Sequence, residues 1–383
     1  MSIPDELRIV DVQAFPTSFP VTAGVTLGIG RAVKRDCVIV KVTTENGLVG
    51  WGESHHGRCP GAIGQLIKTT LRQLVCGMSA TDVVGVWSRI HQRQLASHGM
   101  GTAAALAMSG LDMALWDIRG KAVGWPLYRL LGGSARAIAA YAGGISLGFQ
   151  PPQQLVDEVS NLVGQGYRAI KLRFGDTVSR DIERLSAVRQ AFGADIGIMV
   201  DANVNYTLDD VRNVAAALSD HKVLWLEEPF APQDYRAYRE ARQLVSVPLA
   251  AGENHYTRFE FNRLIEDEAV GILQPDLSKT GGLTEGLRIA ALASAWKLPI
   301  CPHTSASGLN MAASIHLLAS IDNGGYFEAD VARENLFRDQ LTSRPDLLDQ
   351  DGCVYPSDKP GLGVEVDESF LLAHPVIEGP AYV

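Results

Sequence analysis

Ionisable residues end a series of short apolar runs in the second half of the sequence, at nearly constant spacing. Successive members of the series are 23 to 30 residues apart, by subtraction of their numbers. One strand-plus-helix unit of a parallel barrel takes about that many residues, since eight units fill roughly 250. The spacing therefore predicts that each of these residues lies at the carboxyl end of a successive barrel strand. They are Lys171, Asp201, Glu227, Glu253, Asp276, His303 and Glu328.

Eight strand-like runs alternate with seven amphipathic segments after residue 137. The intervening segments are rich in Ala, Leu, Arg and Glu, which is typical of helices. This alternation predicts an α/β fold, a TIM-type (β/α)7β barrel whose active site lies at the carboxyl ends of the strands. The runs are AIAAYAGGI, AIKLRFG, IGIMVDANV, VLWLEEPF, PLAAGENHY, GILQPDLSKTGG, PICPHTS and GYFEAD.

The N-terminal part of the chain predicts a separate α+β unit. Residues 37–53 contain two β-branched runs joined by Asn46-Gly47, which is a strong hairpin signal. Residues 61–131 then follow a helical pattern that ends in a Gly and a Trp-Pro pair. We predict an N-terminal α+β capping domain at 1–133, the barrel domain at 134–351, and a C-terminal segment at 352–383 that returns to the cap.

Composition limits the partners of this chain. The formal charge of −9 argues against nucleic acid, because binding to phosphates needs a basic face. No apolar run approaches the ~20 residues that cross a bilayer, and the start MSIPDELRIV lacks the features of a secretory signal, so we expect a cytoplasmic protein without membrane contact. The five cysteines form no C-x-x-C pair and are expected to be reduced. A small molecule is the expected partner.

Three of the carboxylates are predicted to form a metal site. Asp201, Glu227 and Glu253 would repel one another if they converged at the barrel mouth, and a bound cation resolves that repulsion. Carboxylate oxygens without Cys or His favour Mg²⁺ over zinc. Asn203 lies on the same face of its strand as Asp201, so it is predicted to hydrogen-bond a ligand carboxylate or the substrate, with a turn residue as the open alternative.

Asp276 and His303 are predicted to form an acid/base pair. They end two neighbouring runs, so adjacent barrel strands would bring their side chains within hydrogen-bonding reach. A carboxylate partner fixes the tautomer of an imidazole and raises its basicity.

Taken together, the motifs resemble the enolase superfamily and, within it, the mandelate racemase subgroup. The resemblance covers nearly the whole chain and includes the GLVGWGE hairpin and the helix LDMALWDIRGKAVGWPLYRLLGG of the N-terminal unit. Enzymes of this superfamily use a Lys or His base, with Mg²⁺ stabilising an enediolate. The barrel motifs that carry the resemblance are IKLR, DAN, EEP, GEN, QPD, PH and the Glu of YFEAD.

The resemblance implies a role for each matching residue. One Mg²⁺ per site would be bound by Asp201, Glu227 and Glu253, and the metal would be chelated by the carboxylate of the substrate. His303, oriented by Asp276, would act as base or acid. Lys171 would lie beside the metal-bound carboxylate, and Glu328 would donate a hydrogen bond to the developing enediolate. The resemblance also implies a homo-oligomer. These positive and hydrogen-bonding groups gain strength as negative charge develops, which lowers the barrier of the reaction.

Arg173 departs from the subgroup pattern. Mandelate racemase uses two bases, one of which is the second Lys of its K-x-K motif, and in this chain Arg173 has that position. A guanidinium keeps its proton in proteins, so it is a poor base and is expected to clamp a carboxylate or hydroxyl of the substrate. We therefore expect dehydration of an acid sugar, or a related 2,3-dihydroxy acid, to a 2-keto-3-deoxy acid. A racemase or epimerase of a 2-hydroxy acid or amino-acid derivative, and a catalytically silent relative, are the alternatives.

Two loops of the N-terminal unit are expected to close over the barrel mouth and set specificity. The first, at about 16–35, is rich in glycine, as a mobile lid would be. The second, at about 53–61, carries Ser54, His55, His56 and Arg58, and we assign His55 to substrate binding. These polar groups favour a hydroxylated or acidic substrate, although a solvent-exposed loop explains them equally well.

Overall fold

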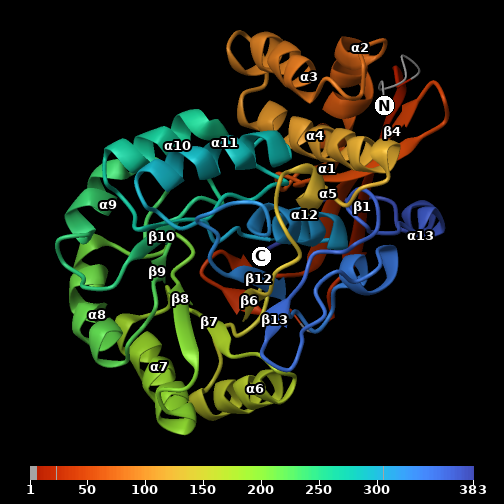
Figure 1. Cartoon of the computed structure of the whole chain (residues 1–383). Helices are drawn as coiled ribbons and strands as arrows, with labels where there is room; N and C mark the ends of the chain where they lie inside the picture. Colours follow the sequence, from red (N-terminus) through yellow and green to blue (C-terminus); the bar gives the residue numbers. More distant parts are fainter. Residues whose placement is uncertain (1–6, 23, 305) are drawn as a thin grey trace.

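A curled sheet of parallel strands, surrounded by helices, forms the centre of the computed structural model, which describes residues 7–22, 24–304 and 306–383 (Figure 1). The strands are hydrogen-bonded in the order β11-β10-β9-β8-β7-β6-β12, so six consecutive strands lie side by side and the last returns to the first. They are β6 (Ile138–Gly143), β7 (Ala169–Arg173), β8 (Gly197–Asp201), β9 (Leu226–Glu227), β10 (Leu249–Ala251), β11 (Ile272–Leu273) and β12 (Phe327–Asp330).

The gap between β11 and β12 is closed by single bridges. Ile300 forms parallel bridges with Leu273 on one side and with Gly324 on the other. The run predicted at 299–305 therefore contributes a bridge in place of a full strand, and residue 305 lies outside the described residues. With this difference, the predicted (β/α)7β barrel is confirmed.

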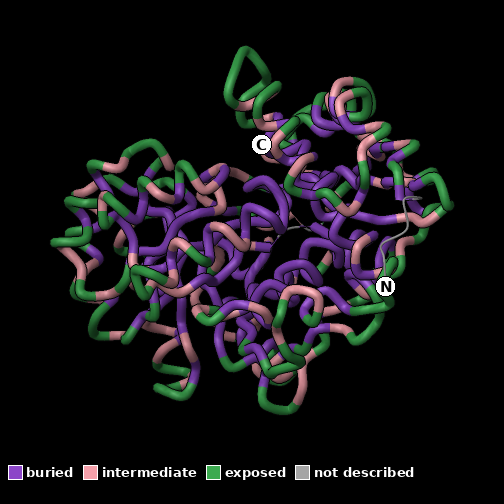
Figure 2. Tube along the Cα trace, turned by 45° about the horizontal axis from the view of Figure 1, so that its top comes forward, coloured by how far each residue is buried: buried purple, intermediate pink, exposed green. Residues whose placement is uncertain are grey.

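In the described part of the chain, seven helices connect the barrel strands and cover the outside of the sheet (Figure 1). Their inner faces are apolar at helical spacing, as in the first of them, where Leu155, Val159 and Leu162 are buried. Figure 2 shows the result, with buried chain inside and exposed chain on the outer turns. The helices are α6 (Pro152–Gly164), α7 (Val178–Phe192), α8 (Leu208–Asp220), α9 (Tyr235–Ala241), α10 (Thr257–Glu266), α11 (Gly282–Ala295) and α12 (Gly308–Leu318).

A layer of apolar side chains fills the interior of the barrel below the predicted site. It includes Ala169, Met199, Trp225 and Cys301, all buried. Side chains of a strand alternate between its faces, so a residue two positions later points to the same interior, one layer nearer the carboxyl end. Lys171, Asp201, Glu227 and His303 follow those four residues by two positions. The apolar layer is therefore the floor on which the polar residues stand.

The N-terminal unit contains an antiparallel sheet and a largely buried helix. The strands β1 (Ile9–Pro20), β4 (Lys34–Thr44) and β5 (Val49–Ser54) pair in the order β1-β4-β5, and the predicted hairpin turn at Asn46-Gly47 is confirmed, with Gly47 at φ +81°. The remaining elements of this unit are β2 (Thr26–Leu27), β3 (Gly30–Arg31), α1 (Pro60–Leu66), α2 (Arg72–Val75), α3 (Val83–Ile90), α4 (Thr102–Val123), α5 (Leu127–Leu130), and π-helical turns at Ile67–Leu71 and His91–Leu95.

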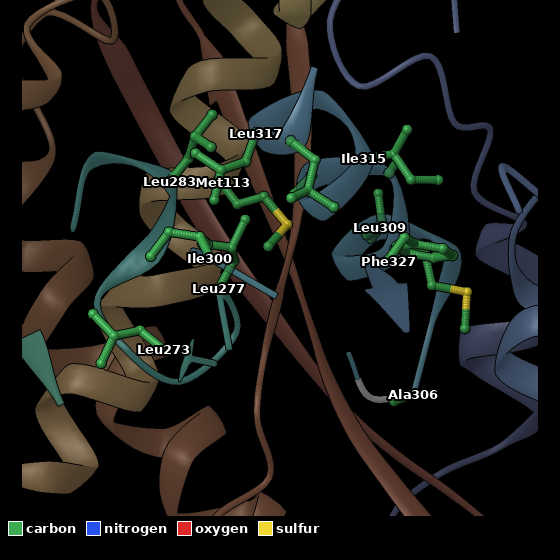
Figure 3. Packing of buried hydrophobic residues seen from close by; sticks show 14 of the residues in the cluster. Met113, Leu273, Leu277, Leu283, Ile300, Ala306, Leu309, Ile315, Leu317 and Phe327 are labelled. Atoms are coloured by element: carbon green, nitrogen blue, oxygen red, sulfur yellow. The ribbon is translucent and has the colours of Figure 1, made fainter. Parts of the chain in front are cut away.

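Helix α4 lies between the N-terminal sheet and the barrel. Its approach to β5 requires glycine, because a Cβ on Gly50 or Gly52 would lie 2.1 or 2.0 Å from a backbone oxygen of the helix. On its other side, Met113 packs near Leu283 and Leu317 of the barrel helices (Figure 3). Asp112 accepts hydrogen bonds from the backbone N–H (2.9 Å) and hydroxyl (2.6 Å) of Thr284 on α11. The two units therefore share one hydrophobic core.

The C-terminal residues run back along the N-terminal unit. A π-helical turn at Phe337–Leu341 is followed by β13 (Cys353–Val354), a two-residue strand antiparallel to β6, and by the short helix α13 (Glu368–Ala373). Antiparallel bridges join Thr17 to Pro375 and Ala32 to Tyr382. The predicted domain boundaries remain a prediction, but these contacts bring the end of the chain to the barrel mouth. No helix in the described part of the chain is long and apolar enough to cross a membrane.

Candidate active site

A cavity of about 460 Å³ opens at the carboxyl ends of the barrel strands, beneath the N-terminal unit. Its volume is within the about 300–1,000 Å³ typical of small-molecule sites. Three parts of the chain line it. The barrel contributes Arg173, Asn203, Glu228, Glu253, Lys279 and His303, the N-terminal unit contributes Lys34, Arg35, His55, His56 and Arg58, and the C-terminal segment contributes Tyr382.

His303 and Asp276 form the predicted pair. His303 Nδ1 lies 2.7 Å from Asp276 Oδ2, while Asp276 Oδ1 accepts hydrogen bonds from the N–H and hydroxyl of Ser278 (2.7 and 2.6 Å) and from Asn310 Nδ2 (3.0 Å). Burial raises the pKa of Asp276, but the His303 contact and its other donors and cations outweigh burial and hold the pKa below its usual value. The ionised carboxylate orients the ring with Nδ1 as donor, so Nε2 is the nitrogen left for chemistry.

In this arrangement His303 Nε2 contacts Glu253 Oε2 at 2.6 Å. Burial alone would lower the pKa of His303, but the Glu253 carboxylate and, to a lesser extent, Glu328 and Asp276 raise it to about 10. The imidazole is therefore protonated while Glu253 is its partner. A cation that neutralises Glu253 weakens this attraction and lowers the pKa of His303 toward its ordinary range.

Lys171 is buried among carboxylates. Its Nζ lies 2.6 Å from Glu227 Oε1, 3.0 Å from Glu328 Oε1 and 3.6 Å from Asp201 Oδ2, and the residue is 1% exposed. Burial lowers the pKa of Lys171, but these three carboxylates raise it above its usual value. Lys171 is thus a fixed positive charge and a poor proton acceptor.

Arg173 points into the same region, as alternation along β7 predicts. Its guanidinium donates to Asp201, to the carbonyl of Gly144 and, at 3.4 Å, to Asn203 Oδ1. Burial lowers the pKa of Arg173, but the surrounding carboxylates, Asp201 first, overcome this effect and raise the pKa above its usual value. Asn203, with φ +43°, donates through its backbone N–H (2.8 Å) and its Nδ2 (3.1 Å) to Asp201. Asn203 therefore lies in the turn after β8, as the alternative had it, and of the two partners considered for its side chain the carboxylate is the one that it contacts.

The three predicted metal ligands lie at adjacent strand ends. Asp201 and Glu227 are in register on β8 and β9, and Glu253 follows β10 by two residues. Each is turned toward a cation of the chain, namely Arg173, Lys171 and His303 respectively. Among residues 7–22, 24–304 and 306–383, no three His, Cys, Asp or Glu side chains are arranged around a common point as ligands.

The charge balance nevertheless fits a divalent cation. Six carboxylates surround the site, against the permanent cations Lys171, Arg173 and Lys279 and the protonated His303. Burial raises the pKa of Glu227, Lys171 lowers it, and the neighbouring carboxylates raise it again. The net pKa is about 7. Oxygen-only donors are the ligands that Mg²⁺ prefers, so this set fits Mg²⁺ better than it fits zinc. The carboxylates are Asp201, Glu227, Glu228, Glu253, Asp276 and Glu328.

Glu328 acts as an acceptor in this arrangement. Its Oε1 accepts from the backbone N–H of Gly144 (3.0 Å) and contacts Lys171, and its Oε2 lies 3.4 Å from the backbone nitrogen of Thr304. Burial raises its pKa, but Lys171, His303 and Arg173 together bring the pKa below its usual value. The donor role implied by the resemblance requires a proton on Glu328, and that role remains a proposal.

His55 lines the cavity as a neutral donor. Its Nδ1 accepts the backbone N–H of Gly57 at 3.1 Å, so the ring proton is on Nε2. Burial, together with the nearby His56, Lys279 and His303, keeps the pKa of His55 well below its ordinary value.

The first predicted lid, at about 16–35, is shorter than expected, because β1 extends to Pro20 and β4 begins at Lys34. Residue 23 lies outside the described residues.

Several lining residues were not assigned from the sequence, among them Glu228, Lys279, Arg35 and Tyr382. Buried Glu228 Oε1 has no hydrogen-bond partner among the described residues, and the Lys279 ammonium lies 3.9 Å from Glu253 Oε2. The sequence could have indicated both residues, since Glu228 follows Glu227 at the strand end and Lys279 follows Asp276 by three residues. No local sequence pattern indicates Arg35 and Tyr382, because their position in the cavity depends on contacts between distant segments.

Known proteins resemble this chain over almost its whole length. Residues 9–132 match the family described as mandelate racemase / muconate lactonizing enzyme, N-terminal domain, and residues 154–370 match the family described as enolase C-terminal domain-like. Arabinonate dehydratase of Saccharolobus solfataricus is 33% identical over 333 residues, covering 86% of this chain and 88% of the relative. D-galactonate dehydratase of Pectobacterium atrosepticum is 30% identical over 353 residues, covering 88% and 90%.

Solved structures agree with this fold. A member of the enolase superfamily from Polaromonas sp. JS666 has a TM-score of 0.96 and 52% identity, covering 98% of this chain and 100% of that one. A mandelate racemase-like protein of Bordetella bronchiseptica RB50, complexed with 2-oxoglutarate/phosphate, has a TM-score of 0.90 and 34% identity, covering 98% and 99%.

Proposed function

This chain is an enzyme of the mandelate racemase / muconate lactonizing enzyme family, in the enolase superfamily, and from that premise we propose that it dehydrates an acid sugar. The substrate would be a 2,3-dihydroxy acid and the product a 2-keto-3-deoxy acid. The homologous arabinonate and galactonate dehydratases support this substrate class. The expected homo-oligomer stays a prediction.

One observation carries the proposal: His303 is a mobile acid/base group, and neither residue at the K-x-K positions is a second one. His303, fixed by Asp276, lines the cavity. Lys171 and Arg173, the groups at those positions, are both held in their charged forms by carboxylates. Dehydration needs only one mobile proton carrier, whereas racemisation needs one on each face of the α-carbon.

Asp201, Glu227 and Glu253 would hold one Mg²⁺. When bound, Mg²⁺ supplies positive charge beside the substrate carboxylate and so makes the α-proton more acidic. Two donors of this chain orient the first of those ligands, since Arg173 and Asn203 both hydrogen-bond Asp201. Trp225 and Gln274 orient the second by donating to Glu227 Oε2 at 3.1 and 2.7 Å.

In the proposed reaction His303 makes two proton transfers. Its neutral Nε2 takes the α-proton, and the negative charge that develops on the substrate carboxylate is stabilised by the nearby Lys171 ammonium. The protonated imidazole next gives its proton to the 3-hydroxyl, which leaves as water while a C2–C3 double bond forms. The resulting enol becomes the 2-keto-3-deoxy acid when C3 is protonated.

The alternatives differ in what they require. A racemase or epimerase needs a second neutral base, and neither group of the K-x-K positions provides one. A catalytically silent relative is set aside, because the homologues are named as enzymes, among them dehydratases and cycloisomerases.

Incubation with Mg²⁺ and a library of acid sugars tests the proposal, with detection of 2-keto-3-deoxy acids. We expect one or more sugars to be converted, and His303→Asn to lower kcat by at least about 10³-fold, because it removes the proton carrier. His98→Asn, which changes an exposed histidine outside the cavity, is the matched control. Full turnover by His303→Asn contradicts the assignment.

A further inference from the structure

The cavity wall formed by the N-terminal unit and the C-terminal segment carries the opposite charge to the barrel wall. We call this wall the cap end of the cavity and define it by Lys34, Arg35, His56, Arg58 and Tyr382. These residues come from β4, from the loop after β5 and from the end of the chain. They lie far apart in the sequence, so their convergence depends on the fold.

Most cations at the cap end are balanced by a carboxylate. Lys34 Nζ lies 3.1 Å from Asp36 Oδ2, and Arg35 Nη2 lies 2.6 Å from Asp330 Oδ2. Arg58 has no carboxylate within ion-pair distance in the part of the chain that the structure describes. Its guanidinium instead lies over the ring of Tyr382, at 5.5 Å from the centroid. The cap end therefore carries one positive charge in excess.

Arg35 contributes a hydrogen-bond donor that is left unpaired. Its side chain is 6% exposed, and its Nη1 is buried with no hydrogen-bond partner among the described residues. A buried charged donor that is left unpaired is costly, so such a group indicates a missing acceptor. Because Arg35 lines the cavity, the acceptor can come from a ligand.

The backbone at Arg58 is held in an uncommon conformation. Arg58 has φ +59°, which is rare for residues other than glycine and costs about 1 kcal/mol or more. His56 Nδ1 accepts the Arg58 N–H at 2.9 Å and so fixes this turn. The same bond leaves the ring proton of His56 on Nε2, which makes His56 a neutral donor.

The surroundings of His56 indicate that the potential at the cap end is positive. Burial lowers the pKa of His56, and Lys279, Arg35, Arg58 and Lys34 lower it further, to about 3. Four cations thus act on one imidazole. An anion bound there would be attracted by the same charges.

We propose that the cap end is a subsite for a second anionic group, so that the preferred substrate is an acid sugar with an anion at each end of its carbon chain. Arg58 and Arg35 Nη1 receive the far anion, His56 donates through Nε2, and Tyr382 holds Arg58 in place. This inference rests on the proposed function for the near carboxylate. A terminal carboxylate and a terminal phosphate ester share the required chemistry, and the experiment separates them.

Binding is measured apart from turnover, with the His303→Asn variant and Mg²⁺, by isothermal titration calorimetry. The probes are matched sets of one configuration: gluconate, glucarate and 6-phosphogluconate, and in parallel galactonate and galactarate. We expect at least one dianion to bind about 10- to 100-fold more tightly than its monoacid, as charge-assisted hydrogen bonds to arginine predict. Preference for the diacid identifies a carboxylate, and preference for the phosphorylated acid identifies a phosphate.

Arg58→Gln, made in the same background, should reduce that preference to within about 3-fold, because dianion affinity should fall much more than monoacid affinity. Arg58→Lys keeps the charge and should retain part of the preference for the dianion. Arg93→Gln removes an exposed arginine of the N-terminal unit outside the cavity and should change nothing. Equal affinity for monoacid and dianion, or an Arg58→Gln variant that weakens both equally, overturns the proposal. Absence of keto-acid product with the dianion preference intact overturns the proposed function alone.

Discussion

The two ends of the cavity differ in charge and in the way the chain builds them. The barrel end consists of carboxylates and their cations at the ends of consecutive strands, so each residue is fixed by the regular geometry of a sheet. The cap end consists of a lysine, two arginines, a histidine and a tyrosine, which come from the start of β4, from the loop after β5 and from the last residues of the chain. From this comparison we propose that the barrel end performs the chemistry and that the cap end selects the substrate.

The first prediction tests the barrel end. Asp201→Asn should lower kcat by about 10³-fold, or about 4 kcal/mol in the barrier, because it removes a proposed metal ligand and the partner of Arg173. Calorimetry with Mg²⁺ alone should show weakened binding. Asp209→Asn, an exposed aspartate on the following helix, is the control. Unchanged Mg²⁺ affinity in Asp201→Asn would remove this residue from the metal site.

The second prediction concerns Arg173, the arginine that departs from the K-x-K motif. Arg173→Lys keeps the charge but cannot reproduce the forked contacts to Asp201 and Gly144, so kcat/KM should fall about 10- to 100-fold. Arg180→Lys, on α7, replaces an exposed arginine and should have no effect. A variant as active as the parent would show that the guanidinium geometry is irrelevant.

The third prediction concerns the joint between the two ends. Glu53 of β5 is 1% exposed and accepts hydrogen bonds from the backbone N–H (3.0 Å) and hydroxyl of Ser307, just past His303. Burial, with the nearby Asp276 carboxylate adding to it, raises its pKa from an ordinary 4.5 to about 8 despite the Ser307 bonds. The folded chain therefore keeps a proton on Glu53 at neutral pH.

The sign of the pH effect follows from that proton. Between pH 4.5 and 8 the unfolded chain has lost a proton that the folded chain retains, so raising the pH favours unfolding. Glu53→Gln keeps the acceptor oxygen and removes this effect. From pH 6 to 8, its stability relative to the parent should rise by about 2 kcal/mol in urea denaturation. Glu45→Gln, 60% exposed, is the control, and parallel pH profiles for parent and Glu53→Gln would refute the assignment.

The smallest effect is expected at the cap end. Tyr382→Ala removes the ring beneath Arg58 and should raise KM about 5-fold with kcat nearly unchanged, as loss of a partly exposed cation–π contact predicts. Tyr355→Ala, an exposed tyrosine of the same C-terminal segment, serves as the control. A fall in kcat at constant KM would place Tyr382 in the chemistry and would break the division between the two ends.

The same division explains what the sequence could predict. Asp201, Glu227 and Asp276 could be placed because strand spacing and alternation are local rules that survive folding. The hairpin at Asn46-Gly47 could be placed for the same reason. The run at 299–305 was overestimated, since its apolar pattern cannot tell a full strand from the bridge at Ile300.

The cap end could not be predicted in this way. Arg35 and Tyr382 meet through an antiparallel contact between residues near 32 and 382, and no local pattern encodes a contact across that separation. The pairing of Glu253 with His303 was also unexpected, because a sequence indicates which groups converge but not which of them pair.

Proton NMR of the reaction in D₂O with Mg²⁺ tests the central claim most directly. If His303 alone carries the proton, the product is a 2-keto-3-deoxy acid with solvent deuterium at C3, and recovered substrate keeps its configuration at C2. Substrate that returns with deuterium at C2 and inverted configuration, without keto acid, would contradict the account and identify a racemase.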